Sequence, residues 1–200
     1  MKQVSQTVYL LSNINEREIL QTLERIGRVC YQSEDKITED SCNAFIKKLI
    51  SNEHLSVLEH ISLTVLIRTN RAIANELVRH RHCAFTQEST RFVKYDNIEC
   101  INSPLPDDWQ GCYEVANDNS ESAYKYMVES GVSRQIAREY LPLGLATSLY
   151  MTANLRAWRY IIKLRSQKFN HPLMVGLMKD ILQIFEAKYP AIFGDIQVEV

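Results

Sequence analysis

The sequence predicts an α+β fold, because segments with the apolar spacing of helices are interspersed with segments that alternate like strands. Apolar residues recur at helical spacing at positions 19, 20, 23, 26 and 30, and again at positions 173, 177, 181, 184 and 185. Between residues 61 and 67, by contrast, isoleucine, leucine and valine occupy every second position, which is typical of a half-buried strand. With 200 residues the chain can bury a core, and we expect residues 1–200 to form a single domain.

The first half of the chain is expected to supply strands and helices in turn. Asn13 or Asn15 can cap the first helix, because a short polar side chain accepts a hydrogen bond from the free amides of the first turn. The other expected elements are a strand over 4–11, a helix over 40–51, a strand over 61–67 and a helix over 71–78.

The second half begins with less regular sequence. We expect a strand over 90–95, followed by an irregular excursion over 97–119, which is rich in Pro, Asp, Asn and Gly. Later elements are a helix over 120–130, a helical segment capped by Ser133, a strand over 147–153, a helix after Asn154 and a last helix that starts near Pro172.

Net charge, cysteine spacing and the lengths of apolar runs argue against several classes of protein. The formal net charge of −1 argues against general nucleic-acid binding, which needs a strongly basic face. Five cysteines form no CxxC pair and no metal-ligand spacing, so we predict neither a disulfide framework nor a metal site. No run approaches the ~20 apolar residues of a membrane span, and the N-terminus lacks a secretory pattern, so we expect a cytoplasmic protein with no membrane partner.

One stretch, residues 79–91, is unusually rich in groups that bind anions. It reads RHRHCAFTQESTR, with three arginines, two histidines and three hydroxyls. An arginine matches a phosphate or carboxylate with a planar set of N–H donors, and hydroxyls can complete the acceptor sites of a phosphate. The alternative is a solvated basic helix end.

Two histidines, His54 and His60, stand in the segment that precedes the strand at 61–67. They could indicate a metal site, but no cysteine or carboxylate spacing completes a set of ligands. Two interpretations stay open for each of them: a hydrogen-bonded histidine that anchors a loop, and a histidine that contacts a ligand.

The order Arg79, His80, Arg81, seven residues and then Ser89 resembles the motif of the flavin-dependent thymidylate synthases. A second similarity is the run TANLRAWRYIIKLR at 152–165, and together the matches cover roughly residues 20–195. The resemblance implies long helices packed on a curved, largely antiparallel sheet. It also implies a homotetramer in which flavin and nucleotide bind where subunits meet.

The resemblance assigns roles to individual residues. The expected dUMP-binding residues are Glu76, Arg79, Gln87, Glu88, Ser89, Thr90, Arg91, Arg138 and Arg165. The expected FAD-binding residues are Ser56, Arg79, His80, Arg81, Gln87, Asn154 and Arg156. Arg165 is also the expected catalytic residue, because it would polarise the uracil ring. Gln87, Tyr160 and Phe169 depart from residues found in other members.

The implied reaction converts dUMP to dTMP, with methylenetetrahydrofolate as the carbon donor and NADPH as the reductant of FAD. The family mechanism needs no enzyme nucleophile, so Cys83 is not expected to act as one, and Ser89 as a nucleophile is an alternative to test. Two other functions stay open: a related flavoenzyme that transfers a one-carbon unit to another pyrimidine nucleotide, and a non-catalytic nucleotide-binding module. Without the resemblance, Arg138 would be an exposed helix-end cation, and Arg156, Arg159 and Lys163 a solvated helix face.

Overall fold

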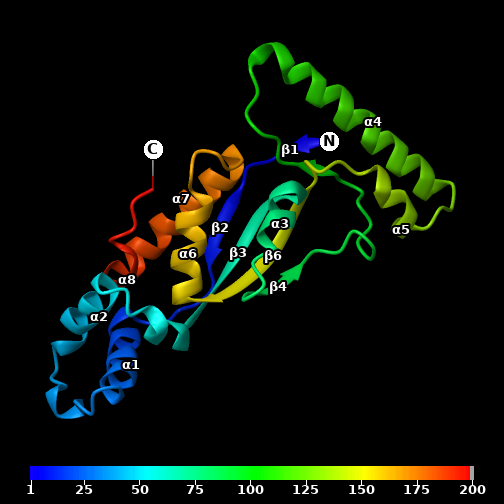
Figure 1. Ribbon diagram of the computed structural model, residues 1–200. Helices are drawn as coiled ribbons and strands as arrows, with labels where there is room; N and C mark the ends of the chain where they lie inside the picture. The colour runs from blue at the N-terminus through cyan, green and yellow to red at the C-terminus, as the bar shows by residue number, and fades with distance from the viewer. Residues whose placement is uncertain (199–200) are drawn as a thin grey trace. The chain divides into compact units, whose positions relative to one another are not determined.

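A computed structural model describes residues 1–198 of the chain (Figure 1). It confirms the α+β class, with helices combined with an antiparallel sheet. The chain divides into two compact units, and the long strands β3 (Ser62–Asn70) and β6 (Ala146–Asn154) contribute residues to both. Unit 1 comprises residues 1–7, 66–80 and 85–150, and unit 2 comprises residues 8–65, 81–84 and 151–200.

The main sheet has four strands, hydrogen-bonded in the order β2-β3-β6-β4. Its outer strands are β2 (Thr7–Leu10) and β4 (Ala84–Gln87). Leu63, Val65 and Ile67 of β3 are fully buried, which confirms the alternation predicted for this segment.

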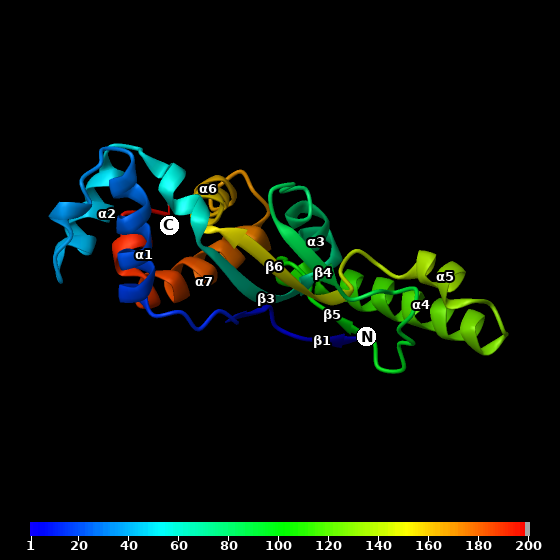
Figure 2. The same cartoon turned by 90° about the horizontal axis from the view of Figure 1, so that it is seen from below.

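Unit 1 contains a small parallel ladder and several helices. β1 (Lys2–Gln3) pairs with β5 (Glu99–Cys100). The helices are α3 (Arg71–Leu77), α4 (Gln110–Glu129) and α5 (Arg134–Ala137), with 3₁₀ turns at Asp107–Trp109 and at η4 (Arg138–Tyr140). α4 and α5 lie side by side (Figure 2). Ile98, Tyr124, Ala137 and Leu145 form a buried apolar cluster in this unit.

Two expectations for unit 1 were wrong. Residues 90–95 are not a strand, because the amides of Phe92 and Val93 both bond to the Ser89 carbonyl and close a turn. Residues 97–119 are only partly irregular, since α4 begins at Gln110. The glycine and asparagines of α4 favour helix poorly, yet tertiary contacts override them: buried Asn117 donates to the Cys100 sulfur at 3.5 Å.

Unit 2 is mainly helical. Its α-helices are α1 (Glu16–Val29), α2 (Ser41–Ser51), α6 (Leu155–Arg165), α7 (Pro172–Lys188) and α8 (Pro190–Phe193), and its 3₁₀ turns are η1 (Glu34–Lys36) and η2 (Leu55–His60). Asn15 is the cap of α1, since its side chain accepts from the Arg17 amide at 2.8 Å. Cys30 is exposed rather than inward, because α1 ends at Val29 and the chain turns away.

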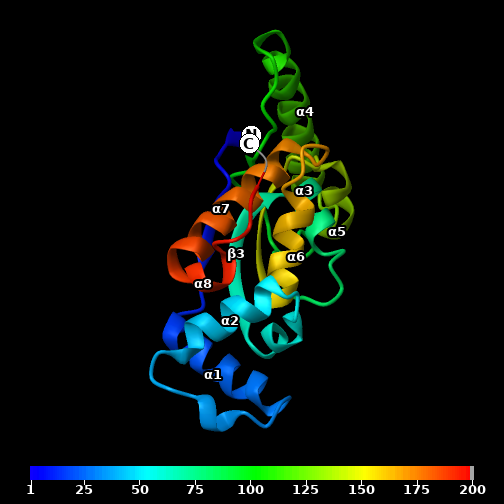
Figure 3. The same ribbon diagram turned by 60° about the vertical axis from the view of Figure 1, so that its left-hand side comes forward.

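Helix α6 is fixed by its cap and by a buried tryptophan. The Asn154 side chain accepts from the Ala157 amide at 2.8 Å, as predicted. Trp158 is fully buried, donates to the Leu63 carbonyl at 3.0 Å and meets the Phe185 ring edge-on at 5.3 Å. Figure 3 shows α6 lying along α7, which carries Phe185.

Arg159 does not belong to a solvated helix face, because it is only 4% exposed. It makes two hydrogen bonds to the Asp195 carboxylate, at 2.5 and 2.6 Å, and a third to the Ile192 carbonyl. These bonds join α6 to the segment that follows α8.

The Arg159–Asp195 pair predicts an acid-dependent loss of stability. Hydrogen bonds from Arg159 lower the pKa of Asp195 in the folded state. The pair therefore stabilises the fold above the ordinary pKa of an aspartate, and this contribution disappears as the pH falls through the lowered pKa. We expect Asp195→Asn to lower the free energy of unfolding at pH 7 by about 1 to 2 kcal/mol, since half-exposed Asp195 is partly screened by solvent.

Urea unfolding at pH 7, 5 and 3 measures this contribution. The difference between wild type and Asp195→Asn should shrink toward pH 3. Asp180→Asn, an exposed site on α7, is the matched control and should show little difference at any pH. A difference for Asp195→Asn that stays constant over this range would contradict the assignment.

Candidate active site

A loop over residues 88–95 follows β4 in unit 1 and contains the end of the 79–91 stretch. The Glu88 amide bonds to the Ser148 carbonyl of β6 at 2.9 Å, so Glu88 continues the pairing of β4. The Arg91 amide donates to the Ser89 hydroxyl at 3.3 Å, and Thr90 is buried. Two of the three hydroxyls of the 79–91 stretch, those of Ser89 and Thr90, therefore lie in a tight turn, whereas Thr86 belongs to β4.

Guanidinium groups from separate helices meet this 88–95 loop. An Arg71 nitrogen donates to the Glu88 carbonyl at 2.9 Å, and an Arg138 nitrogen reaches the Thr90 hydroxyl at 3.3 Å. Arg134 donates to the Phe92 carbonyl at 2.8 Å. Together with exposed Arg91 they surround the turn with positive charge, which is the arrangement needed to bind an anion.

Arg71 was missed as a site residue, because the sequence placed it at the start of a helix that ends where the 79–91 stretch begins. Its Nε atom is buried and has no hydrogen-bond partner among residues 1–198. Its position in the sequence did offer a signal. A cation in the first turn of a helix is disfavoured by the helix dipole, so an arginine there indicates a favourable contact outside the helix.

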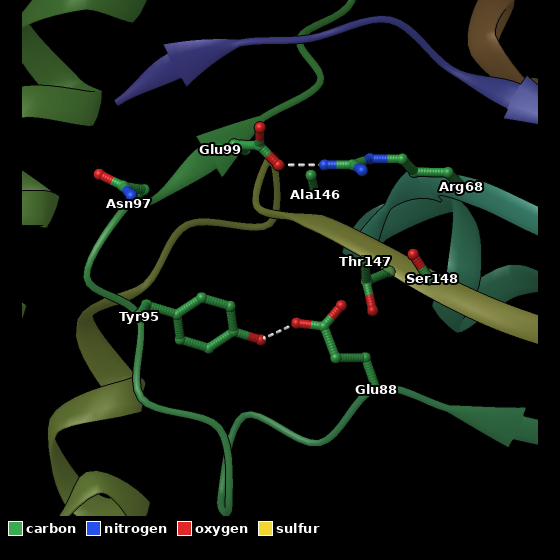
Figure 4. A pocket seen from close by; sticks show the side chains of 8 residues that line it. All are labelled: Arg68, Glu88, Tyr95, Asn97, Glu99, Ala146, Thr147 and Ser148. Carbon is green, nitrogen blue, oxygen red and sulfur yellow. Dashed lines mark hydrogen bonds and ion pairs between the residues drawn. The ribbon is translucent and has the colours of Figure 1, made fainter.

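A cavity of about 260 Å³ lies beside the loop (Figure 4). Its lining residues are Arg68, Glu88, Tyr95, Asn97, Glu99, Ala146, Thr147 and Ser148. Inside it the Tyr95 hydroxyl donates to the Glu88 carboxylate at 2.5 Å, and Arg68 pairs with Glu99. Burial, followed by the bond to Glu88, raises the pKa of Tyr95 well above its usual value, so this hydroxyl stays protonated.

The remaining unit 1 candidates flank this region along the chain. Glu76 lies in the last turn of α3, and Arg79 follows the helix, with its amide bonded to the Glu76 carbonyl at 3.2 Å. His80 follows directly and is half-buried. Gln87 is the last residue of β4 and donates to the Thr147 hydroxyl at 3.3 Å.

The other candidates belong to unit 2. Asn154 and Arg156 stand at the start of α6 and half-buried Arg165 at its end, while exposed Ser56 lies on η2, which contacts α6. Arg156 pairs with Glu59 of η2 at 2.5 Å. Exposed Arg81 also falls in this unit.

Residues 1–198 contain no group of three or more His, Cys, Asp or Glu side chains placed to hold a metal ion. His54 precedes η2 and His60 is its last residue, and neither belongs to such a group in the described residues. In the same residues no helix is both long and apolar enough to cross a membrane.

Comparison with known proteins assigns the chain to a family. The family model described as "Thymidylate synthase complementing protein" matches residues 11–191. The flavin-dependent thymidylate synthase of Corynebacterium diphtheriae is 31% identical over 199 residues, covering 89% of this chain and 79% of the relative. That of Mycobacteroides abscessus is 32% identical over 197 residues, covering 88% and 79%. This chain belongs to the flavin-dependent thymidylate synthase family.

A solved structure supports the fold of this family member. The UMP/dUMP methylase PolB from Streptomyces cacaoi, bound with 5-Br dUMP, superposes with a TM-score of 0.83 at 20% identity. The superposition covers 97% of this chain and 96% of PolB. The α+β arrangement of helices and sheet is therefore shared over the length of both chains.

The residues of unit 2 suit the flavin that membership of the family implies. Arg156 supplies a charged fork of donors, and the Asn154 side chain keeps its amide donors because only its oxygen is used in capping α6. The hydroxyl of Ser56 is exposed on an element that contacts α6. Such donors match the oxygens and ring acceptors of a flavin nucleotide, although Glu59 would share Arg156 with it.

Cys83 has the chemistry of an inert thiol in this flavin-dependent thymidylate synthase family member. Burial raises the pKa of Cys83, so its sulfur is protonated at neutral pH. Because the thiolate is the nucleophilic form, Cys83 is poorly suited to attack a substrate.

Proposed function

We propose that this enzyme converts dUMP to dTMP, with methylenetetrahydrofolate as the carbon donor, FAD as the bound flavin and NADPH as the reductant. The observation that carries the proposal is the convergence of Arg71, Arg134 and Arg138 on the 88–95 loop of a flavin-dependent thymidylate synthase family member. FAD supplies the redox chemistry, whereas the protein supplies binding, orientation and electrostatics.

The 88–95 loop is proposed to bind the nucleotide. Ser89, Arg91 and Arg138 hold the phosphate with hydroxyl and guanidinium donors, and Arg71 adds positive charge behind the turn. Glu76, Arg79, Gln87, Glu88 and Thr90 complete the proposed dUMP-binding set. In this role Ser89 binds an anion and forms no covalent bond.

The residues at the two ends of α6 have different proposed roles: those at its start bind FAD, and the one at its end acts in the chemical step. Asn154 and Arg156 hold FAD, together with Ser56, Arg79, His80, Arg81 and Gln87. Arg165 faces the pyrimidine and stabilises the negative charge that the ring gains during the reaction. We further propose that the chain is a single flavin-dependent thymidylate synthase domain and that it assembles as a cytoplasmic homotetramer in which subunits jointly form each site.

The proposal is tested by incubating the purified protein with dUMP, methylenetetrahydrofolate and NADPH and identifying the product by mass spectrometry. We expect dTMP, together with flavin absorbance in the protein and FAD after its release. Parallel incubations with UMP and with dCMP test the related flavoenzymes that act on another pyrimidine nucleotide. A colourless protein that forms no methylated nucleotide even with added FAD would overturn the proposed function.

Flavin retention should depend on Arg81. Arg81→Ala removes a charge-assisted donor to the FAD pyrophosphate, and such a bond contributes about 1.5 to 3 kcal/mol, equivalent to an affinity loss of roughly 10-fold to 150-fold. The measurement is the ratio of flavin to protein absorbance after gel filtration, followed by titration with FAD. Arg25→Ala, which removes an exposed arginine of α1, is the matched control. Full flavin occupancy in Arg81→Ala would count against this assignment.

A further inference from the structure

Glu88 and Tyr95 close the loop that carries the nucleotide-binding candidates. The Tyr95 hydroxyl donates to the Glu88 carboxylate at 2.5 Å, so the two ends of the 88–95 loop are joined side chain to side chain (Figure 4). Both residues are half-buried, and they line the cavity beside the loop rather than its exposed tip. The bond is charge-assisted, which makes it one of the stronger contacts of the loop.

Each end of the loop is also attached to a rigid element. At Tyr95, the amide donates to the hydroxyl of Tyr124 on α4 at 3.4 Å, and the two rings meet edge-on at 6.2 Å. Tyr124 is 1% exposed. At Glu88, the amide bonds to Ser148 of β6 and the carbonyl accepts from Arg71 of α3. The loop is therefore held between a strand and two helices.

Between these attached ends lie Ser89, Thr90 and Arg91, whose donors have to point at one ligand at the same time. A free loop would lose conformational entropy each time it bound, which lowers affinity. A loop closed in advance avoids most of that cost. We therefore expect the bond that joins the two ends of the loop to raise its affinity for the ligand.

We propose that Glu88 and Tyr95 are positioning residues that hold the 88–95 loop in its nucleotide-binding conformation, and this inference rests on the proposed function. Tyr95 acts only through Ser89, Thr90 and Arg91, whereas Glu88 also belongs to the proposed dUMP-binding set, so Tyr95→Phe tests the positioning role by itself. Burial raises the pKa of Tyr95, so its hydroxyl keeps the proton that it donates to Glu88.

The decisive variant is Tyr95→Phe, which removes the hydroxyl and keeps the ring that packs on Tyr124. We expect the Kd for dUMP, measured by isothermal titration calorimetry, and the KM for dUMP to rise about tenfold. The kcat at saturating dUMP, the flavin content and the rate of flavin reduction by NADPH should stay close to wild type. Tyr126→Phe, at a site 72% exposed on α4, is the matched control and should change none of these quantities.

Substitutions of Glu88 distinguish the loss of its bond to Tyr95 from a general loss of structure in the 88–95 loop. Glu88→Gln keeps an oxygen that can accept from Tyr95, so its Kd for dUMP should lie between those of wild type and Glu88→Leu. Combining Glu88→Leu with Tyr95→Phe should raise the Kd little beyond either single change, because both remove the same bond.

Results of three kinds would overturn the inference. Wild-type affinity in Tyr95→Phe, or additive effects in the double variant, would show that the bond does not set the loop. A Tyr95→Phe protein whose kcat falls while its Kd is unchanged would place the hydroxyl in the chemical step. Failure of the wild-type protein to bind dUMP would overturn the proposed function and this inference with it, whereas the first two results would overturn the inference alone.

Discussion

Arg165→Ala should retain FAD and its reduction by NADPH, yet slow flavin re-oxidation by dUMP and methylenetetrahydrofolate by about 100-fold to 1,000-fold. A fixed guanidinium aimed at developing charge acts mainly on the transition state, and loss of one such donor commonly has an effect of this size. Arg165 is half-buried at the end of α6, a helix whose start is fixed by the Asn154 cap. Stopped-flow absorbance follows each half-reaction separately.

Two further variants test whether the effect is specific to the guanidinium group of Arg165. Arg165→Lys keeps the charge but loses the planar fork of donors, so its re-oxidation rate should fall between those of wild type and alanine. Lys163→Ala removes an exposed cation from the same helix and should behave as wild type. Near-normal re-oxidation in Arg165→Ala would exclude the proposed role, and a defect confined to the NADPH step would move Arg165 to the flavin site.

The parts of the fold that were predicted correctly are those in which local sequence and burial agree. In β3 every second side chain is buried, so the alternation at 61–67 could be read directly. The strand β6 and the helix α6 were predicted because an apolar strand is followed by Asn154, a residue suited to capping. These elements carry much of the candidate site.

The errors arise where distant contacts decide the local structure. Residues 110–119 look irregular alone, but as part of α4 they place buried Asn117 on Cys100, seventeen residues away. Residues 90–95 have strand-like composition, yet their amides bond to Ser89 and the loop is joined by Glu88 and Tyr95. Pattern analysis along the chain does not detect such pairings.

Contacts between residues far apart in the sequence also limited the prediction of the candidate site. The motif at 79–91 predicts an anion-binding loop, because arginines and hydroxyls in one short stretch suit a phosphate or carboxylate. It could not reveal Arg71, whose contact is with the Glu88 carbonyl, or the contact of Arg138 with Thr90 across 48 residues. For Arg159 a solvated helix face was one alternative, and the local sequence could not exclude it because the partner, Asp195, lies 36 residues away.

The largest effect on stability is expected at Trp158, which joins β3, α6 and α7. Trp158→Ala should lower the free energy of unfolding by about 3 to 5 kcal/mol, because it leaves a cavity against Phe185 and removes the donor to the Leu63 carbonyl. Urea unfolding followed by circular dichroism measures the change. Since α6 carries Asn154 and Arg156, flavin content should fall in the same variant.

Trp158→Phe separates the loss of packing from the loss of the hydrogen bond, because it keeps an aromatic ring and loses the N–H group. We expect it to be destabilised by roughly 1 to 3 kcal/mol, less than alanine, because the Leu63 carbonyl loses its partner while most of the packing remains. Trp109 is 60% exposed, so Trp109→Ala is the natural control and should cost less than about 0.5 kcal/mol. If the phenylalanine variant were as unstable as alanine, the hydrogen bond would outweigh packing at this site. If neither variant differed from Trp109→Ala, Trp158 could not be the contact that fixes α6.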